Sequence, residues 1–470
     1  MANADTEASG VDKIGLSVSL IWLSVMASTG LVWATVGGTA LHVAFLLSQV
    51  VVISIVIWQA CDPFAEAAQW IGMKFHIPGS VRGATLDAVA SSMPELFTGI
   101  FFVVLAIFAA GDSAEDLKAA GSHGYGPTVA TCAGSAIYNM ILIPAICALV
   151  ISYVRRSRPA IDIAKTVILR DGMWFLGCEL LLIVFLFQNQ MHWWMGVVLL
   201  VLYISYVRKL YADAGRFRRA IHAVDDHLGG KFAGLQTSQI EDALNAQEIR
   251  PSAALVEEVH ARLSAKAQGE IDDIDEEGEE EPDAASALFG LFEVPLTSIT
   301  AWLVIAFATV VAAASCYWLV EVTREASLVM NVPIFFVAVI VAAAASSVPD
   351  TFLSIGASRR GDDDGAVANA FGSNIFDICV CLAIPLLVGC YLNGWVPISL
   401  TQEDGSPMAG LVGIRILLLV LTVITLLIMW HHQRLTRGKA FILCGLYGIF
   451  VLYAIAGSLG YGVEQLIGNP

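Results

Sequence analysis

The chain has 470 residues, of which 57% are hydrophobic and only 14% are charged. Soluble domains carry roughly 25% charged residues, so this composition excludes an ordinary soluble protein and favours one that crosses a membrane many times. The net charge of −17 does not by itself predict a cationic partner, because ten acidic residues lie together between Glu270 and Asp283 and charge runs of this kind are usually solvated.

Apolar stretches of about 20 residues recur along the chain and predict eleven membrane-spanning helices. Lys13 is the one basic residue before the first stretch, and a cleaved signal normally has a more basic start and a shorter apolar core. We therefore expect the first span to be retained. In chain order the predicted spans are residues 14–34, 41–60, 80–109, 126–153, 172–189, 192–207, 298–320, 332–357, 365–392, 409–430 and 438–458.

A polar segment divides these spans into six and five, so that removing the first span leaves five in each half. We predict an N-terminal tail with an extra span (1–35), a first repeat (36–207), a cytoplasmic acidic linker (208–296) and a second repeat (297–470). The linker has weak helical patterning and is too short and too polar for a large domain. We expect a flexible tether rather than a regulatory unit.

Basic residues in the loops indicate how the halves are oriented. They form four clusters that fall on one side of the predicted topology, which the positive-inside rule assigns to the cytoplasm. The clusters are Arg155, Arg156, Arg158, Lys165 and Arg170; Arg208, Lys209, Arg216, Arg218 and Arg219; Arg359 and Arg360; and Arg434, Arg437 and Lys439. Five spans is an odd number, so the halves enter the membrane in opposite directions. The sequence thus predicts an all-α polytopic membrane protein with two inverted repeats of five transmembrane helices and one extra N-terminal helix.

Two short segments in the two halves are imperfect copies of each other. Residues 91–97 read Ser-Ser-Met-Pro-Glu-Leu-Phe and residues 346–352 read Ser-Ser-Val-Pro-Asp-Thr-Phe, so Glu95 and Asp350 each follow a proline. A proline inside a helix lacks the N–H and clashes with the carbonyl four residues back, so we expect both spans to be kinked and to present backbone oxygens. A carboxylate within hydrocarbon is expensive and marks a functional site.

Each copy is followed by a second motif, Gly-Ser-Ala-Ile-Tyr-Asn at residues 134–139 and Gly-Ser-Asn-Ile-Phe-Asp at residues 372–377. In both, the serine and the last residue are spaced i,i+4 and share a helical face. A single Gly-Ser pair would suggest only close helix packing, but four motifs in a repeated order predict one ion site. Hydroxyl, carboxylate and carbonyl oxygens suit hard cations such as Ca²⁺. The candidate ligands are Ser91, Glu95, Ser135, Asn139, Ser346, Asp350, Ser373 and Asp377.

These motifs resemble the sodium/calcium exchanger superfamily, most closely its potassium-dependent branch. The resemblance implies that Glu95 and Asp350 are the central calcium ligands and are shared with sodium. It also implies that Ser91 and Ser346 offer backbone carbonyls, and that an acid at Asp377 is tied to potassium binding. By resemblance, the flanking sodium ligands are Ser92, Ser135, Ser347, Ser373, Asn139 and Asp377.

One residue departs from the family pattern. Asp87 stands eight positions before Glu95, where the family usually has an apolar residue. It could line the inner vestibule, but we expect a water-exposed position near the cytoplasmic mouth.

The sequence therefore predicts a secondary active antiporter that exchanges sodium for calcium by alternating access, with potassium as a candidate co-substrate. It predicts no enzymatic activity, no cofactor other than the transported ions and no nucleic-acid partner, in an integral multi-pass protein of the plasma membrane or an inner membrane. One alternative is a proton-coupled divalent cation exchanger of the same fold, because partly buried carboxylates can carry protons. Another is an intramembrane aspartyl protease using Asp350 and Asp377, and a third is a calcium-permeable channel.

Overall fold

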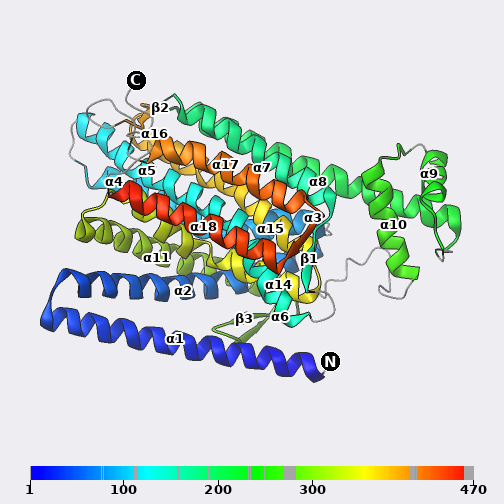
Figure 1. Cartoon of the computed structure of the whole chain (residues 1–470), viewed down its shortest axis with the longest axis horizontal. Helices are drawn as coiled ribbons and strands as arrows, with labels where there is room; N and C mark the ends of the chain where they lie inside the picture. Colours follow the sequence, from blue (N-terminus) through cyan, green and yellow to red (C-terminus); the bar gives the residue numbers. More distant parts are fainter. Residues whose placement is uncertain are drawn as a thin grey trace.

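The computed structural model describes residues 2–75, 77, 79–110, 114–155, 159–188, 190–230, 232, 234–247, 249–267, 282–401, 408 and 410–459. Most of this chain forms long helices that lie roughly side by side in one bundle (Figure 1). Within the described residues, nine helices and one bent pair of helices are long and apolar enough to cross a membrane. The all-helical, multi-pass architecture predicted from the sequence is confirmed.

The first half of the chain supplies the elements up to the polar segment. They are α1 (Ala2–Val36), α2 (Thr39–Lys74), α3 (Gly79–Arg82), η1 (Gly83–Asp87), α4 (Ala88–Phe108), α5 (Ala114–Ile137), η2 (Tyr138–Leu142), α6 (Ile143–Val154), β1 (Ala160–Asp162), α7 (Lys165–Leu186), β2 (Gln190–Met191) and α8 (Trp193–Leu228). The elements marked η are single π-helical segments, and they continue directly into the α-helices on either side.

The second half repeats this order. After α9 (Thr237–Ala246), α10 (Ala253–Ala267), β3 (Ala284–Ala287) and β4 (Phe292–Pro295) come α11 (Ser298–Met330), α12 (Ile334–Val337), η3 (Ala338–Ala342), α13 (Ala343–Ser346), α14 (Val348–Arg360), α15 (Asp363–Phe376), η4 (Asp377–Cys381), α16 (Ala383–Leu392), β5 (Ile398–Ser399), α17 (Leu411–Trp430), β6 (Arg434–Thr436) and α18 (Arg437–Ser458).

The predicted span at residues 172–189 differs from the others. It forms α7, which packs against α15 and α17 inside the bundle but is not apolar enough to count among the candidate spans of the described chain. The reason is three charged residues, Arg170, Asp171 and Glu179. Asp171 and Glu179 are 1% and 0% exposed, so protein rather than lipid surrounds these groups.

Two short strand pairs join the halves. β1 pairs antiparallel with β6, and β2 pairs antiparallel with β5. In the order of elements, β1 and β2 flank α7 just as β5 and β6 flank α17. β1 and β2 lie at opposite ends of the bundle (Figure 1). If each strand is replaced by its equivalent in the other half, the β1–β6 pair becomes the β2–β5 pair at the opposite end of the bundle. This is the geometry of an inverted repeat.

The basic end of the bundle is tied together by charged groups. Arg434 of β6 lies 3.2 Å from the Asp162 carboxylate of β1. Arg155, at the end of α6, lies 2.8 Å from the Asp363 carboxylate at the start of α15. Members of two of the predicted basic clusters thus lie at the end where β1 lies, which the positive-inside rule predicts to be the cytoplasmic end.

Part of the predicted linker forms a small helical unit. α8 continues past the predicted boundary at residue 207 to Leu228, and α9 and α10 fold back on it beyond the bundle (Figure 1). The unit has its own apolar core of Ala220, Ile221, Val224, Phe232, Leu235, Ile240, Ala243, Leu244, Leu255, Val256, Val259 and Leu263. Most of the acidic run from Glu270 lies outside the described residues, and the domain boundaries remain predictions.

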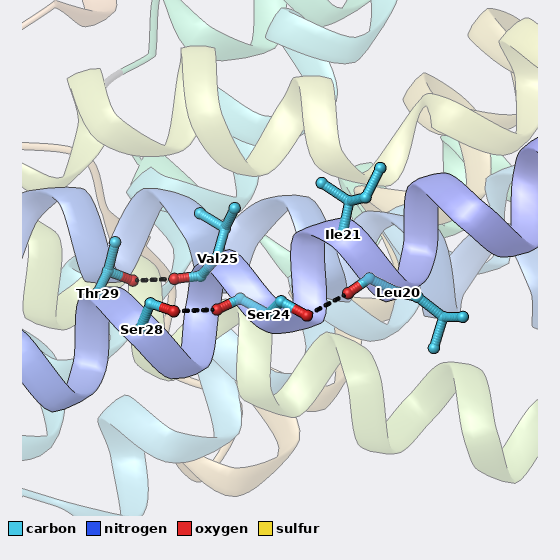
Figure 2. Close-up of a pocket in the computed structure, with 6 residues that line it drawn as sticks. All are labelled: Leu20, Ile21, Ser24, Val25, Ser28 and Thr29. Carbon is cyan, nitrogen blue, oxygen red and sulfur yellow. Dashed lines mark hydrogen bonds between the residues drawn. The ribbon is translucent and has the colours of Figure 1, made fainter.

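α1 lies at the edge of the bundle beside α2 (Figure 1). Several of its hydroxyls bond within the helix, as Figure 2 shows: Ser24 Oγ donates to the Leu20 carbonyl, and Ser28 Oγ donates to the Ser24 carbonyl, at 2.8 and 2.7 Å. A hydroxyl satisfied in this way carries little penalty in lipid, so α1 can span the membrane with most of its surface exposed.

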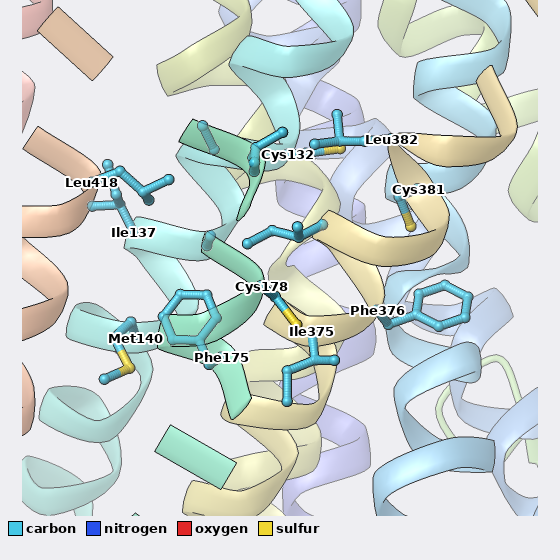
Figure 3. Close-up of a cluster of buried hydrophobic side chains, with 14 of the residues drawn as sticks. Cys132, Ile137, Met140, Phe175, Cys178, Ile375, Phe376, Cys381, Leu382 and Leu418 are labelled. Carbon is cyan, nitrogen blue, oxygen red and sulfur yellow. The ribbon is translucent and has the colours of Figure 1, made fainter. Parts of the chain in front are cut away.

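The main apolar core surrounds the middle of the bundle and brings the halves together. Figure 3 shows side chains of α5, η2 and α7 packed against those of α15, η4 and α17. The labelled members are Cys132, Ile137, Met140, Phe175, Cys178, Ile375, Phe376, Cys381, Leu382 and Leu418. This close packing fixes the helices that carry the candidate ligands.

Candidate functional site

The structure buries every candidate ligand. α4 carries the first Ser-Ser-x-Pro-acid motif, and the α13–α14 junction carries the second; the Gly-Ser motifs lie at the α5–η2 and α15–η4 junctions. All ten side chains have 0% exposure: Ser91, Ser92, Glu95, Ser135, Asn139, Ser346, Ser347, Asp350, Ser373 and Asp377. The sequence halves therefore converge on one enclosed polar cluster.

The four π-helical segments mark the same places in the two repeats. η1 precedes Glu95 by the same number of residues as η3 precedes Asp350. η2 contains Asn139 as its second residue, and η4 begins with Asp377. Single π turns inside α-helices occur frequently at functional sites, and here they recur with the repeat.

The two prolines act differently. Pro94 lies within the continuous helix α4, so the first span is not interrupted there. Pro349 lies at the start of α14, which is bent by 41° from the preceding helical segment with Ser347 between them. A proline in the first turn of a helix is tolerated because its missing N–H needs no partner there. Only the second repeat therefore has a broken span.

The Ser135 hydroxyl lies at the centre of the cluster. Its Oγ is 3.3 Å from Oε1 of Glu95 and 2.8 Å from Oδ2 of Asp377. It also lies 2.8 Å from Oγ of Ser347, which itself donates to Oε1 of Glu95 at 3.2 Å. Two carboxylates thus meet around one hydroxyl, and a hydroxyl has a single proton to donate.

Asp350 has donors from both repeats. Ser373 Oγ donates to its Oδ1 at 2.6 Å, and the Asn139 amide donates to its Oδ2 at 3.3 Å. Asn139 also donates to Ser135 Oγ at 3.3 Å, so a continuous set of hydrogen bonds joins Glu95 to Asp350. The Ser91 hydroxyl extends the set through Ser373 Oγ at 3.2 Å.

Two candidate ligands also contact groups outside the cluster. Ser346 Oγ donates to the Ala343 carbonyl of its own helix at 3.2 Å. The Ser92 carbonyl accepts the Cys381 thiol, with sulfur and oxygen 3.5 Å apart. Asp87 accepts a hydrogen bond from the Gln69 amide at 3.2 Å and is partly exposed.

Several buried oxygens of the cluster have no hydrogen-bond partner among the described residues. They are Ser92 Oγ, Glu95 Oε2, Asn139 Oδ1 and Asp377 Oδ1. A buried polar group without a partner costs about 1–3 kcal/mol, and more for a charged group. Carboxylate, amide and hydroxyl oxygens are the ligands of Ca²⁺ and similar hard cations, so these four are oxygens of the kind that a cation would bind.

The acids do not form a metal centre alone. Across the described chain, no three His, Cys, Asp or Glu side chains are grouped so that they could hold a metal ion by themselves. A bound cation would need hydroxyl, amide or backbone oxygens as well.

Sequence reasoning missed Asn374. This residue is fully buried, donates to the Ala136 carbonyl at 3.1 Å, and its Oδ1 has no partner within the described part of the chain. Ala136 stands at the equivalent position of the first repeat, so the two equivalent positions touch each other. The signal available was an amide where the other copy of the motif has alanine.

Comparison with known proteins agrees with this geometry. The family described as "Sodium/calcium exchanger protein" matches residues 45–211 and 300–456. The chain is 22% identical to Sodium/potassium/calcium exchanger 2 of Gallus gallus over 89% of this chain and 77% of that protein. It is 23% identical to Sodium/potassium/calcium exchanger 5 of Homo sapiens over 82% of this chain and 78% of that protein.

Among solved structures, the crystal structure of the H⁺/Ca²⁺ exchanger CAX superposes with a TM-score of 0.57, covering 96% of this chain and 94% of that one at 12% identity. At this identity the likeness concerns the fold. The family match covers both halves of the chain and the four repeated motifs, and the chain therefore belongs to the sodium/calcium exchanger family of integral membrane antiporters.

Proposed function

We propose that this protein moves Ca²⁺ across a membrane in exchange for Na⁺, and that both ions bind at the Glu95–Asp350 cluster. The observation that carries the proposal is the enclosed set of carboxylate, amide and hydroxyl oxygens, several of which have no partner within the described chain. The relatives named sodium/potassium/calcium exchangers support the choice of ions.

Competition for the same oxygens supplies the coupling. The carboxylates favour either one divalent ion or several monovalent ions, because each arrangement compensates most of their negative charge. Without a cation, Glu95 and Asp377 face each other across one hydroxyl, and buried like charges without compensation are strongly unfavourable. The empty site should therefore change sides poorly, which links the movement of one ion to the return of the other.

Potassium is the finer part of the proposal. Asp377 takes the place that Asn139 has in the first repeat, which gives the site an additional negative charge. The extra charge would accommodate K⁺ together with Ca²⁺, as the names of the relatives suggest.

Replacing Glu95 with Gln tests the proposal. Glu95→Gln keeps the size of the side chain but removes a charge, and loss of a central ligand should weaken calcium uptake at least about tenfold, corresponding to about 1.4 kcal/mol. The measurement is sodium-gradient-driven ⁴⁵Ca²⁺ uptake into proteoliposomes.

The matched control is Glu321→Gln. Glu321 of α11 is partly exposed and lies 3.5 Å from Arg324 on its own helix, so its uptake should match the wild type. Varying the sodium, potassium and pH gradients one at a time identifies the coupling ion. Uptake driven by a pH gradient without sodium would support proton coupling instead, and undiminished uptake in Glu95→Gln would refute the proposed site.

A further inference from the structure

A second line of polar side chains leads from the cluster toward the basic end of the bundle. Ser354 and Ser358 lie one and two helical turns after Asp350 on α14, and Asn369 lies one turn before Ser373 on α15. Residues spaced i,i+4 share a helical face. The Asn369 amide donates to Ser354 Oγ at 3.1 Å, which shows that the two helices turn these faces to each other. We call Ser354, Ser358 and Asn369 the inner track.

The inner track is buried and incompletely bonded. Ser354 and Ser358 have 0% exposure and Asn369 has 9%. Ser358 Oγ and Asn369 Oδ1 have no hydrogen-bond partner within the described residues. An unpaired buried polar group is unfavourable, and polar side chains that face the interior of a membrane protein often mark the path of an ion or substrate.

The first repeat has no such line at the equivalent positions. One and two turns after Glu95 stand Gly99 and Val103, and one turn before Ser135 stands Thr131. The Thr131 hydroxyl is satisfied by the Pro127 carbonyl of its own helix at 3.0 Å. A Cβ at Gly99 would lie 2.8 Å from the Thr128 side chain and 3.1 Å from that of Pro385. At the equivalent positions the first repeat therefore has a single hydroxyl, which is satisfied within its own helix, and no free space beside Gly99.

An ion pair lies over the far end of the inner track. The Arg155 guanidinium binds both carboxylate oxygens of Asp363, at 2.8 and 3.0 Å, and also donates to the Ser358 carbonyl. A bidentate pair of this kind fixes the relative orientation of the two side chains as well as compensating their charges. Arg155 belongs to the first repeat whereas Ser358 and Asp363 belong to the second, so any movement between the repeats must alter this contact.

We propose that the inner track is the cytoplasmic route to the ion site, that it holds a partly dehydrated cation in transit, and that the Arg155–Asp363 pair closes its end. The inference rests on the proposed exchange function. Two hydroxyls and an amide oxygen can replace part of the hydration shell of Na⁺ or Ca²⁺, and without a carboxylate they would release the ion readily. The route is one-sided because the repeats differ at these three positions.

Transport kinetics test the route. Asn369→Leu should lower the maximal rate of sodium-driven ⁴⁵Ca²⁺ uptake about tenfold, which corresponds to about 1.4 kcal/mol in the barrier. The half-saturating Ca²⁺ concentration in equilibrium binding should stay unchanged, because the central ligands remain. Asn369→Ser, which keeps an oxygen, should restore most of the rate. The matched control is Thr131→Val, at the equivalent position of the first repeat, which should transport like the wild type.

Accessibility from one side gives a second test that does not depend on transport. In inside-out vesicles, Ser358→Cys should react with a small cationic methanethiosulfonate, and added Ca²⁺ should slow the reaction. Arg155→Gln in the same chain should accelerate it. Val103→Cys, the equivalent position of the first repeat, should stay unreactive from this side. The unsubstituted protein gives the background, because eight of its nine cysteines are buried and Cys444 is partly buried.

Each result of these experiments either supports or overturns the proposed route. The proposal is overturned if Ser358→Cys is unreactive under all ionic conditions, if Asn369→Leu transports at the normal rate, or if Thr131→Val is slowed as strongly as Asn369→Leu. If the unsubstituted protein shows no sodium-driven uptake, the exchange function fails, and labelling of Ser358→Cys still reports whether the route exists.

Discussion

Ser135 is the residue at which the two repeats meet most closely. It lies on the first repeat, yet its hydroxyl contacts Asp377 and Ser347 of the second repeat as well as Glu95 of the first. Its single proton can be donated to only one of these acceptors at a time, and Ser347 is the other donor to Glu95. With a cation bound, the Ser135 oxygen would act as a ligand.

We expect Ser135→Ala to weaken cation binding without unfolding the protein. The substitution removes one ligand oxygen and one donor to a charged group, worth about 1.5–3 kcal/mol, and should raise the sodium and calcium concentrations for half-maximal uptake at least about tenfold. Concentration series of ⁴⁵Ca²⁺ uptake check this. Ser152→Ala is the matched control, because Ser152 donates to the Leu149 carbonyl of its own helix. Equal effects of the two substitutions would contradict the central role of Ser135.

At this scale the sequence predicted which side chains gather, but not how they pair. All ten residues identified from the repeated motifs and the family resemblance have 0% exposure. Neither motif could show that the Ser346 hydroxyl turns to its own helix or that Asn374 reaches across to Ala136. Such pairings depend on how the two repeats are placed against each other, and a sequence pattern describes one helix at a time.

Among the elements, the contact between α5 and the η3–α13 segment brings the repeats close together. Gly134 makes it possible, because a Cβ there would meet the Val339 carbonyl and would lie 2.7 Å from the Ala343 Cβ. Small residues allow helix backbones in membranes to approach this closely. The neighbouring Ser135 reaches the second repeat only because the backbones are so near.

We predict that Gly134→Ala destabilises the protein by about 1–3 kcal/mol, as expected for overpacking, and reduces exchange by moving Ser135 away from its partners. Gly177→Ala is the control: a Cβ at Gly177 of α7 has no neighbour within 4 Å, so this helix should keep its stability or gain a little. Thermal unfolding of both variants in detergent, followed by uptake in proteoliposomes, measures the difference. A Gly134→Ala protein as stable as the wild type would show that the close approach is not required.

The positions of the helices followed from the sequence, but their internal irregularities did not. Apolar stretches of the right length predict a span, and each predicted span coincides with a helix, including α7. The four π-helical segments lie in stretches with ordinary helical composition. Pro94 and Pro349 occur in nearly the same motif, yet only the second lies at a break between two helices, because tertiary packing decides whether a proline starts a helix or is absorbed within one.

The whole molecule is two interlocked repeats, and its inverted arrangement was predictable from the odd number of spans in each half. The strand pairs β1–β6 and β2–β5 could not be predicted, since strands of two or three residues leave no recognisable pattern. The segment that forms the helical unit on α8 was expected to be a flexible tether, because its apolar residues are sparse in the sequence. They form a core only when α8, α9 and α10 pack together.

These contacts predict that the two halves can assemble from separate chains. The strand pairs, the core and the ion site all join the halves noncovalently, and the core of the helical unit lies entirely before residue 267. We expect residues 1–267 and 282–470, expressed together, to copurify through a tag on one half and to restore sodium-driven ⁴⁵Ca²⁺ uptake, whereas neither half alone should transport. A second half with Asp350→Asn should still copurify but should not restore uptake, because assembly depends on packing and transport on the shared site. Transport by a single half, or copurified halves that bind no calcium, would contradict a site built jointly by the two repeats.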